Sequence, residues 1–95
     1  MPIEISKITA PKAEKYRDML SKHFARKVTV DQTDKLTSVV NFPMGECRIH
    51  AFDDQLSFHC HAENDQALEA VKSVIDRHIP LLKDIRDIQL EWQRE

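Results

Sequence analysis

The chain has 95 residues, a net charge of -2 and 32% charged residues, a balance typical of a globular protein. This length suits a single core, so we expect residues 1–95 to form one domain. The chain contains one glycine, whereas average usage would give roughly six or seven. Phosphate-binding loops and dinucleotide fingerprints need two or three glycines each, so both are excluded.

Charge and hydropathy also limit the partners. The sequence pI of about 6.2 is unlike that of a typical nucleic-acid-binding domain, so no nucleic acid is expected. No apolar run approaches the ~18 residues of a membrane span, so no membrane insertion is expected. The first residues lack the charged start and apolar core of a signal peptide. We therefore expect a cytoplasmic protein with both cysteines reduced.

The chain opens with a strand and a helix. Weak alternation predicts a strand over residues 2–8, with Ile3 and Ile5 on one side. Thr9 is placed to cap the next segment, and Pro11 suits a first helical turn. The helix is predicted over 11–26, and its apolar residues follow helical spacing: Ala13, Tyr16, Leu20 and Phe24.

Period-two patterns then predict four strands. The first two cover residues 28–31 and 36–42, on either side of a polar turn. Residues 42–45 fit a type I turn, with Pro43 second and Gly45 fourth, so these two are the candidate structural turn residues. Two more alternating runs follow, over 46–52 and 55–62, separated by Asp53 and Asp54.

A second helix and a last strand complete the pattern. Asn64 is a natural N-cap, and Pro80 ends or kinks the helix that follows. Residues 88–93 alternate as a final strand, in which Trp92 is the expected largest core anchor. The order β-α-β-β-β-β-α-β predicts an α+β two-layer sandwich, with a mainly antiparallel sheet of about five strands and two helices packed on one face.

The central hairpin decides which side chains share a face. If its apolar residues face the helices, the connection has an even number of residues, and Cys47 lies opposite Cys60 in a non-hydrogen-bonded pair. Such a pair is either a redox dithiol or two small buried side chains, and burial is the favoured interpretation.

The opposite face of this hairpin carries the candidate site. It pairs Glu46 with His61, Arg48 with His59 and His50 with Ser57. Imidazoles two residues apart beside a carboxylate are able to bind a transition metal, which is the candidate cofactor. The alternative is a solvated sheet face. The candidate ligand-binding residues are His50, His59, His61 and Arg48, and the candidate metal ligands are His59, His61 and Glu46.

Several segments together resemble domain of unknown function 2218, a family of short prokaryotic proteins. The similarity covers almost the whole chain and is carried by these features: the Thr-led helix with Tyr16 and Leu20; Phe42-Pro43-Met44-Gly45-Glu46-Cys47, where the family commonly has Phe-Pro-Phe-Gly-x-Cys; the strands that reach Ala51 and Ala62; the acidic-capped helix with His78; and Arg86 to Trp92. Met44, Gln55 and Pro80 depart from the pattern, and His59 and His61 fall where members vary. The resemblance implies an α+β domain with no assigned activity and an association with iron-siderophore uptake genes.

Three functions remain open. The first is a non-catalytic binding or accessory module for a small-molecule or metal ligand, tied to iron or siderophore handling by the resemblance. The second is a structural or interaction protein that forms a homodimer through its open sheet face. The third is a thiol- or metal-dependent enzyme, ranked last because no activated nucleophile or acid–base pair stands out.

Overall fold

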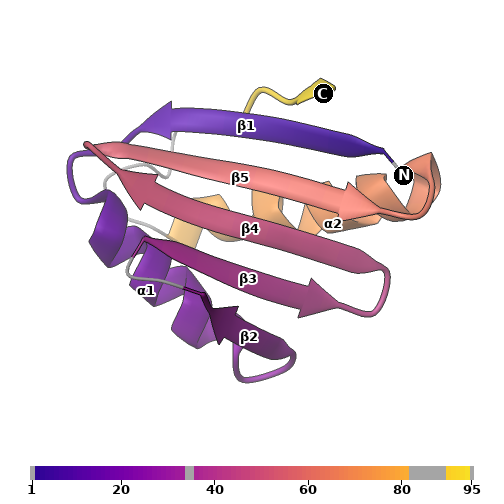
Figure 1. The fold of residues 1–95 in the computed structure, drawn as a ribbon, viewed down its shortest axis with the longest axis horizontal. Helices are drawn as coiled ribbons and strands as arrows, with labels where there is room; N and C mark the ends of the chain where they lie inside the picture. Colours follow the sequence, from indigo (N-terminus) through magenta and orange to yellow (C-terminus); the bar gives the residue numbers. More distant parts are fainter. Residues whose placement is uncertain (1, 34–35, 82–89, 95) are drawn as a thin grey trace.

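A computed structural model describes residues 2–33, 36–81 and 90–94. Its elements are β1 (Ile3–Thr9), α1 (Ala13–Phe24), β2 (Thr29–Gln32), β3 (Thr37–Phe42), β4 (Gly45–Phe52), β5 (Gln55–Ala62), α2 (Asp65–His78), the 3-10 turn η1 (Ile79–Leu81) and β6 (Gln93–Arg94). The six strands described form one antiparallel sheet, in the order β2-β3-β4-β5-β1-β6, with both helices on the same face (Figure 1). The predicted α+β sandwich is confirmed, and its sixth strand is a two-residue edge.

The β4–β5 hairpin has the expected two-residue turn. Asp53 and Asp54 have φ angles of 52° and 59°, in the left-handed region. Positive φ at both central residues is characteristic of the type I′ turn, whose twist matches that of the flanking strands. The resulting register places Cys47 opposite Cys60 and His61 opposite Glu46, as predicted.

The core lies between the sheet and the helices. The sheet contributes Phe58, Ile49 and Leu56, which are fully buried, and α2 contributes Leu68 and Ile75. No helix within the described ranges is long and apolar enough to cross a membrane.

The predicted start of the first helix is wrong. Thr9 is the last residue of β1, and the N-cap is Lys12, which makes no side-chain capping hydrogen bond. The physical reason is the neighbouring hairpin, because Thr9 pairs with Gln55 and the Ala10 N–H donates to the Asp54 carbonyl at 2.7 Å. The chain is therefore held extended past Thr9, and α1 covers a shorter range than the predicted 11–26.

The second helix begins where the sequence predicts. The Asn64 side-chain oxygen accepts a hydrogen bond from the Ala67 N–H at 2.8 Å, which satisfies one of the free donors of the first turn. The helix ends at His78, and Pro80 lies in η1. Proline has no N–H to donate to the helix, which accounts for this end.

The C-terminal segment departs from the predicted strand. Ile88 lies outside the described residues, residues 90–92 form no strand, and β6 pairs with Glu4 and Ile5 of β1. Trp92 is only partly buried, and its indole N–H donates to an Asp76 carboxylate oxygen at 3.2 Å. Its ring thus lies beside polar groups of α2, and Phe58 rather than Trp92 is the largest fully buried side chain among the described residues.

A buried ion pair joins β1 to α2. The Lys72 ammonium lies 3.0 Å from a Glu4 carboxylate oxygen and 2.6 Å from Glu69, and Arg94 approaches Glu4 at 3.4 Å. Burial lowers the pKa of Lys72, but its hydrogen bonds to Glu69 and Glu4 outweigh that effect, so the net shift is upward. The charged form of Lys72 is therefore favoured where β1, α2 and the C-terminal segment meet.

Gly45 occupies a place where a larger residue would collide. A Cβ atom at this position would overlap the His61 carbonyl oxygen and come within 3.0 Å of Val71 on α2. The φ angle of Gly45 is not positive, so room rather than backbone freedom explains the glycine. It begins β4 opposite Ala62, directly after the two-residue connection that contains Pro43.

We predict that Gly45→Ala lowers the free energy of unfolding by about 1–3 kcal/mol, the usual effect of overpacking. Val at the same position should lower it further because it brings more atoms against the His61 carbonyl and α2. Urea denaturation followed by circular dichroism measures the change. Pro43→Ala is the control, since it alters the same connection at an exposed position. Equal stability of Gly45→Ala and the wild type would contradict the close-approach argument.

Candidate functional site

The sheet face away from the helices carries the histidines. On β4 and β5 the core-facing residues alternate with Glu46, Arg48, His59 and His61. The predicted cross-strand pairs, Glu46 with His61 and Arg48 with His59, are present in the register. β1 lies next to β5, with Ile3 opposite His61. Three strands therefore supply side chains to one small area.

These side chains surround a hollow of about 300 Å³, which we call the sheet-face hollow. It is lined by Ile3, Glu46, Arg48, His59 and His61. The hollow combines imidazoles, a guanidinium, a carboxylate and one apolar wall. A few convergent polar groups in a concavity are the usual features of a small-ligand site.

Ile3 is the member that sequence reasoning missed. The sequence places Ile3 in the first strand without indicating its neighbour, and the pairing of β1 with β5 brings it beside His61. Strand order between segments this far apart follows from packing rather than from local pattern. The alternation of β1 was the available signal, because it places Ile3 and Glu4 on opposite faces.

Weak ion pairs hold the polar groups of the hollow. A Glu46 carboxylate oxygen lies 3.6 Å from His61 Nδ1 and 3.9 Å from Arg48 Nε. The Glu46 and His61 side chains are about 30% exposed, and that of Arg48 is 60% exposed. Exposed pairs of this kind contribute at most about 1 kcal/mol. A ligand could therefore displace these contacts with only a small loss of interaction free energy.

His50 lies on the same face but does not line the sheet-face hollow. Its Nδ1 is 2.7 Å from the Thr37 hydroxyl oxygen, on the neighbouring strand β3. The four other predicted ligand and metal residues line the hollow together, while His50 makes its contact to one side.

The hollow does not by itself form a metal cage. Within the described parts of the chain, no group of three or more His, Cys, Asp or Glu side chains is arranged to hold a metal ion. The predicted set of His59, His61 and Glu46 therefore does not assemble as three ligands. β5 places two imidazoles, those of His59 and His61, on the same side of the strand. Each is a nitrogen donor suited to Zn, Cu, Fe or Ni.

The two thiols lie on the opposite, core-facing side. Cys47 and Cys60 face each other across β4 and β5, and both are free and completely buried. Burial raises the pKa of the Cys47 thiol well above its usual range, with a further contribution from Cys60. Because the thiolate is the reactive form, this environment disfavours thiol chemistry. The geometry therefore favours the interpretation of two buried structural side chains.

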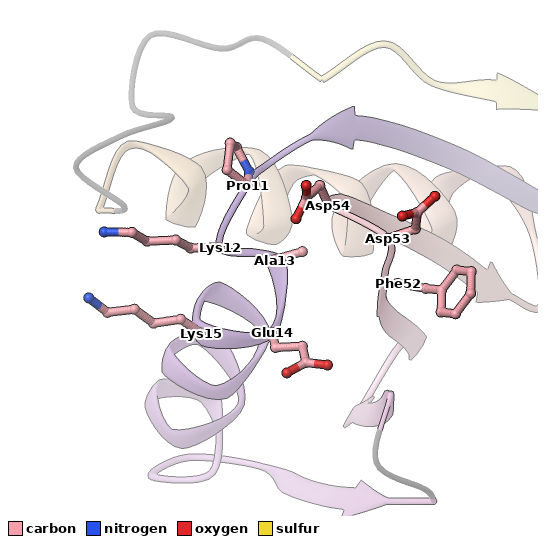
Figure 2. A pocket seen from close by; sticks show the side chains of 8 residues that line it. All are labelled: Pro11, Lys12, Ala13, Glu14, Lys15, Phe52, Asp53 and Asp54. Atoms are coloured by element: carbon pink, nitrogen blue, oxygen red, sulfur yellow. The ribbon is translucent and has the colours of Figure 1, made fainter.

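A second hollow lies where the β4–β5 turn meets the start of α1. Its residues include Phe52, whose surface is 59% exposed, together with Asp54 and Lys12. Figure 2 shows the Lys12 and Lys15 side chains extending away from Phe52 and Asp53. The charged groups of this hollow do not converge on a common point, so it is a weaker candidate than the sheet-face hollow.

We predict that neither cysteine reacts with iodoacetamide in the native protein at pH 8. Both should be labelled in 6 M guanidinium chloride, where burial no longer protects them. Intact-mass spectrometry counts the modified thiols. Rapid native labelling of Cys47 would mean that the thiol is accessible and would return the dithiol enzyme to consideration.

Comparison with known proteins adds a family and a fold. The family model described as an uncharacterized protein conserved in bacteria, DUF2218, matches residues 5–93. The NMR structure of PA4090 from Pseudomonas aeruginosa is similar, with a TM-score of 0.81, 19% sequence identity and coverage of 98% of this chain and 96% of that chain. At this identity the likeness shows the fold alone. No curated protein matches the sequence.

Proposed function

The chain belongs to the bacterial DUF2218 family, and from its sheet-face hollow we propose that it is a non-catalytic binding module for a small ligand. The observation that carries the proposal is the convergence of two imidazoles, a guanidinium and a carboxylate around one hollow. The family itself brings no assigned activity. The buried thiols give the alternative of a dithiol enzyme no support.

The ligand class that fits best is a metal chelate with open coordination positions. His59 and His61 are able to donate two nitrogens, but the described residues offer no third ligand in place for a bare ion. A metal that arrives with its own chelator already has most of its positions filled. Two protein nitrogens would then complete the coordination.

Arg48 is placed to bind the chelator, whereas His59 and His61 would bind the metal. Its side chain is 60% exposed beside the hollow, and a guanidinium binds carboxylates through two parallel hydrogen bonds. Metal chelators often carry carboxylates. A ferric complex of this kind is also consistent with the siderophore association that the family resemblance implies. We therefore propose iron-chelate handling as the role of the module.

The test is titration calorimetry with Ni(II)–nitrilotriacetate and with ferric citrate, with NiCl2 alone as the bare-ion comparison. We expect the chelates to bind more tightly than NiCl2. The double variant His59→Ala/His61→Ala should weaken chelate binding at least about tenfold, which corresponds to about 1.4 kcal/mol. Arg48→Gln should weaken the carboxylate-bearing chelates but not NiCl2.

His50→Ala is the matched control, because it removes a histidine from the same sheet face but not from the hollow. It should leave chelate affinity unchanged. Equal binding by the wild type and the double histidine variant, or no heat with any of these probes, would overturn the proposal.

A homodimer through the open sheet face is the second candidate. It is favoured by the exposed Phe52 and by half-buried Ile3 and Ile5 on that face. Such side chains are able to form the apolar centre of an isologous contact.

Sedimentation equilibrium tests this alternative. If the face mediates dimerisation, the wild type should be dimeric at 100 µM and Ile5→Lys should be monomeric, because the added charge would be buried in the contact. Met19→Lys, at an exposed position on α1, is the control. A monomeric wild type at that concentration would rule the dimer out.

A further inference from the structure

A separate pocket lies on the other side of the sheet, between the C-terminal ends of α1 and α2. It has a volume of about 250 Å³, and we call it the helix-end pocket. Its apolar walls include Phe24, Phe42 and Val74, and its polar members are His23, Lys27 and His78. None of these residues lines the sheet-face hollow.

The walls of this pocket form a set of aromatic rings. The ring of Phe24 meets that of Phe42 edge-on, with centroids 5.5 Å apart, and that of His78 at 4.6 Å. The His23 ring packs edge-on against His78 at 4.9 Å. Aromatic rings prefer such edge-to-face and offset contacts. A flat ring entering the pocket would find the same kinds of partner.

The backbone acceptors near the pocket are already hydrogen-bonded. The Phe24 carbonyl accepts from the N–H groups of Lys27 and Val28 at 3.0 and 2.9 Å. The His78 ring donates from Nδ1 to the Val74 carbonyl at 2.6 Å. These bonds satisfy carbonyls at both helix ends, which would otherwise repel an anion.

The charge that remains near the pocket is positive. The charged or titratable groups that act on His23 are His78 of α2 together with Arg26 and Lys27, which follow α1. Burial and then these three basic groups lower the pKa of His23. A bound anion would relieve this mutual repulsion. A bare metal ion between His23 and His78 would increase it.

The positions of the helix ends account for part of this arrangement. Basic side chains in a last helical turn complement the helix dipole and need no ligand. That argument does not explain an apolar space beside them with Phe42 and Val74 only partly buried. Space, aromatic walls and positive charge together point to an anionic aromatic molecule.

We propose that the helix-end pocket binds a small aromatic carboxylate, one flat ring that bears one carboxylate group. The ring packs against the walls that Phe24 and Phe42 form together, and the carboxylate meets the Lys27 ammonium and the His23 imidazole at the rim. A cavity of about 150 Å³ holds a benzene molecule, so this volume accommodates a single ring and its carboxylate.

The experiment is an NMR titration of the whole 15N-labelled protein with sodium benzoate. We expect saturable shifts at residues 23–28, 42 and 74–78. Benzamide has the same shape without the charge and should bind at least about fivefold more weakly, a difference of about 1 kcal/mol. Acetate has the charge without the ring and should not saturate these shifts.

Two variants assign the contacts. Lys27→Gln should reduce benzoate affinity toward that of benzamide while leaving benzamide binding unchanged, and Val74→Phe should fill the pocket and abolish both. Lys15→Gln, at the opposite end of α1, is the charge-matched control. Benzoate affinity should also rise as the pH falls and His23 becomes protonated, whereas benzamide affinity should stay constant.

Equal affinities for benzoate and benzamide, shifts confined to other residues, or unchanged binding by Lys27→Gln would overturn the proposal. Shifts at His23 and His78 with ZnCl2 but not with benzoate would show a metal pair instead. Because the probes and residues differ from those of the sheet-face hollow, failure here is distinguishable from failure of the chelate site.

Discussion

The turn between β4 and β5 determines which side chains meet the helices and which remain on the open face. Side chains alternate along a strand, so a slip of one residue would exchange the two sets. Asp53 and Asp54 prevent this by adopting left-handed backbone angles that close a two-residue turn. The buried cysteines and the open histidines are therefore two results of one backbone geometry.

The same hairpin positions the helical layer. At its far end Gly45 leaves room for the His61 carbonyl and for Val71 of α2. The chain thus uses a glycine for close packing, and uses aspartates for the turn that requires positive φ. α2 can approach the sheet there, and the polar residues on the reverse side of β4 and β5 are held on a rigid support.

Local sequence patterns were sufficient to predict most of the fold. Alternation in β4 and β5 predicted the register, and Asn64 predicted the start of α2, because both depend on neighbours in sequence. The predicted start of α1 and the predicted role of Trp92 as the largest core residue were wrong for the opposite reason. Each depends on a distant segment: the Asp54 carbonyl holds Ala10 extended, and Asp76 accepts the hydrogen bond of the Trp92 indole.

The same difference between local and distant contacts decides which parts of the candidate sites could be predicted from the sequence. The sequence predicted the shared face of His59, His61, Arg48 and Glu46, since parity alone places them together. It could not predict Ile3 beside them, because that contact needs the pairing of β1 with β5. Nor did it predict the helix-end pocket, which arises only where the ends of α1 and α2 meet.

The position of β1 has a consequence for the order of assembly. The strand lies between β5 and β6, and its Glu4 carboxylate bonds Lys72, a residue 68 positions along the chain. During synthesis β2, β3 and β4 can pair locally before β5 and Lys72, which supply the strand neighbour and the counter-ion of β1, have been made. Closing so long a loop is slow relative to local hairpins. Although β1 precedes the other described strands in the chain, it is therefore expected to be among the last to join the sheet, and its insertion completes the native fold.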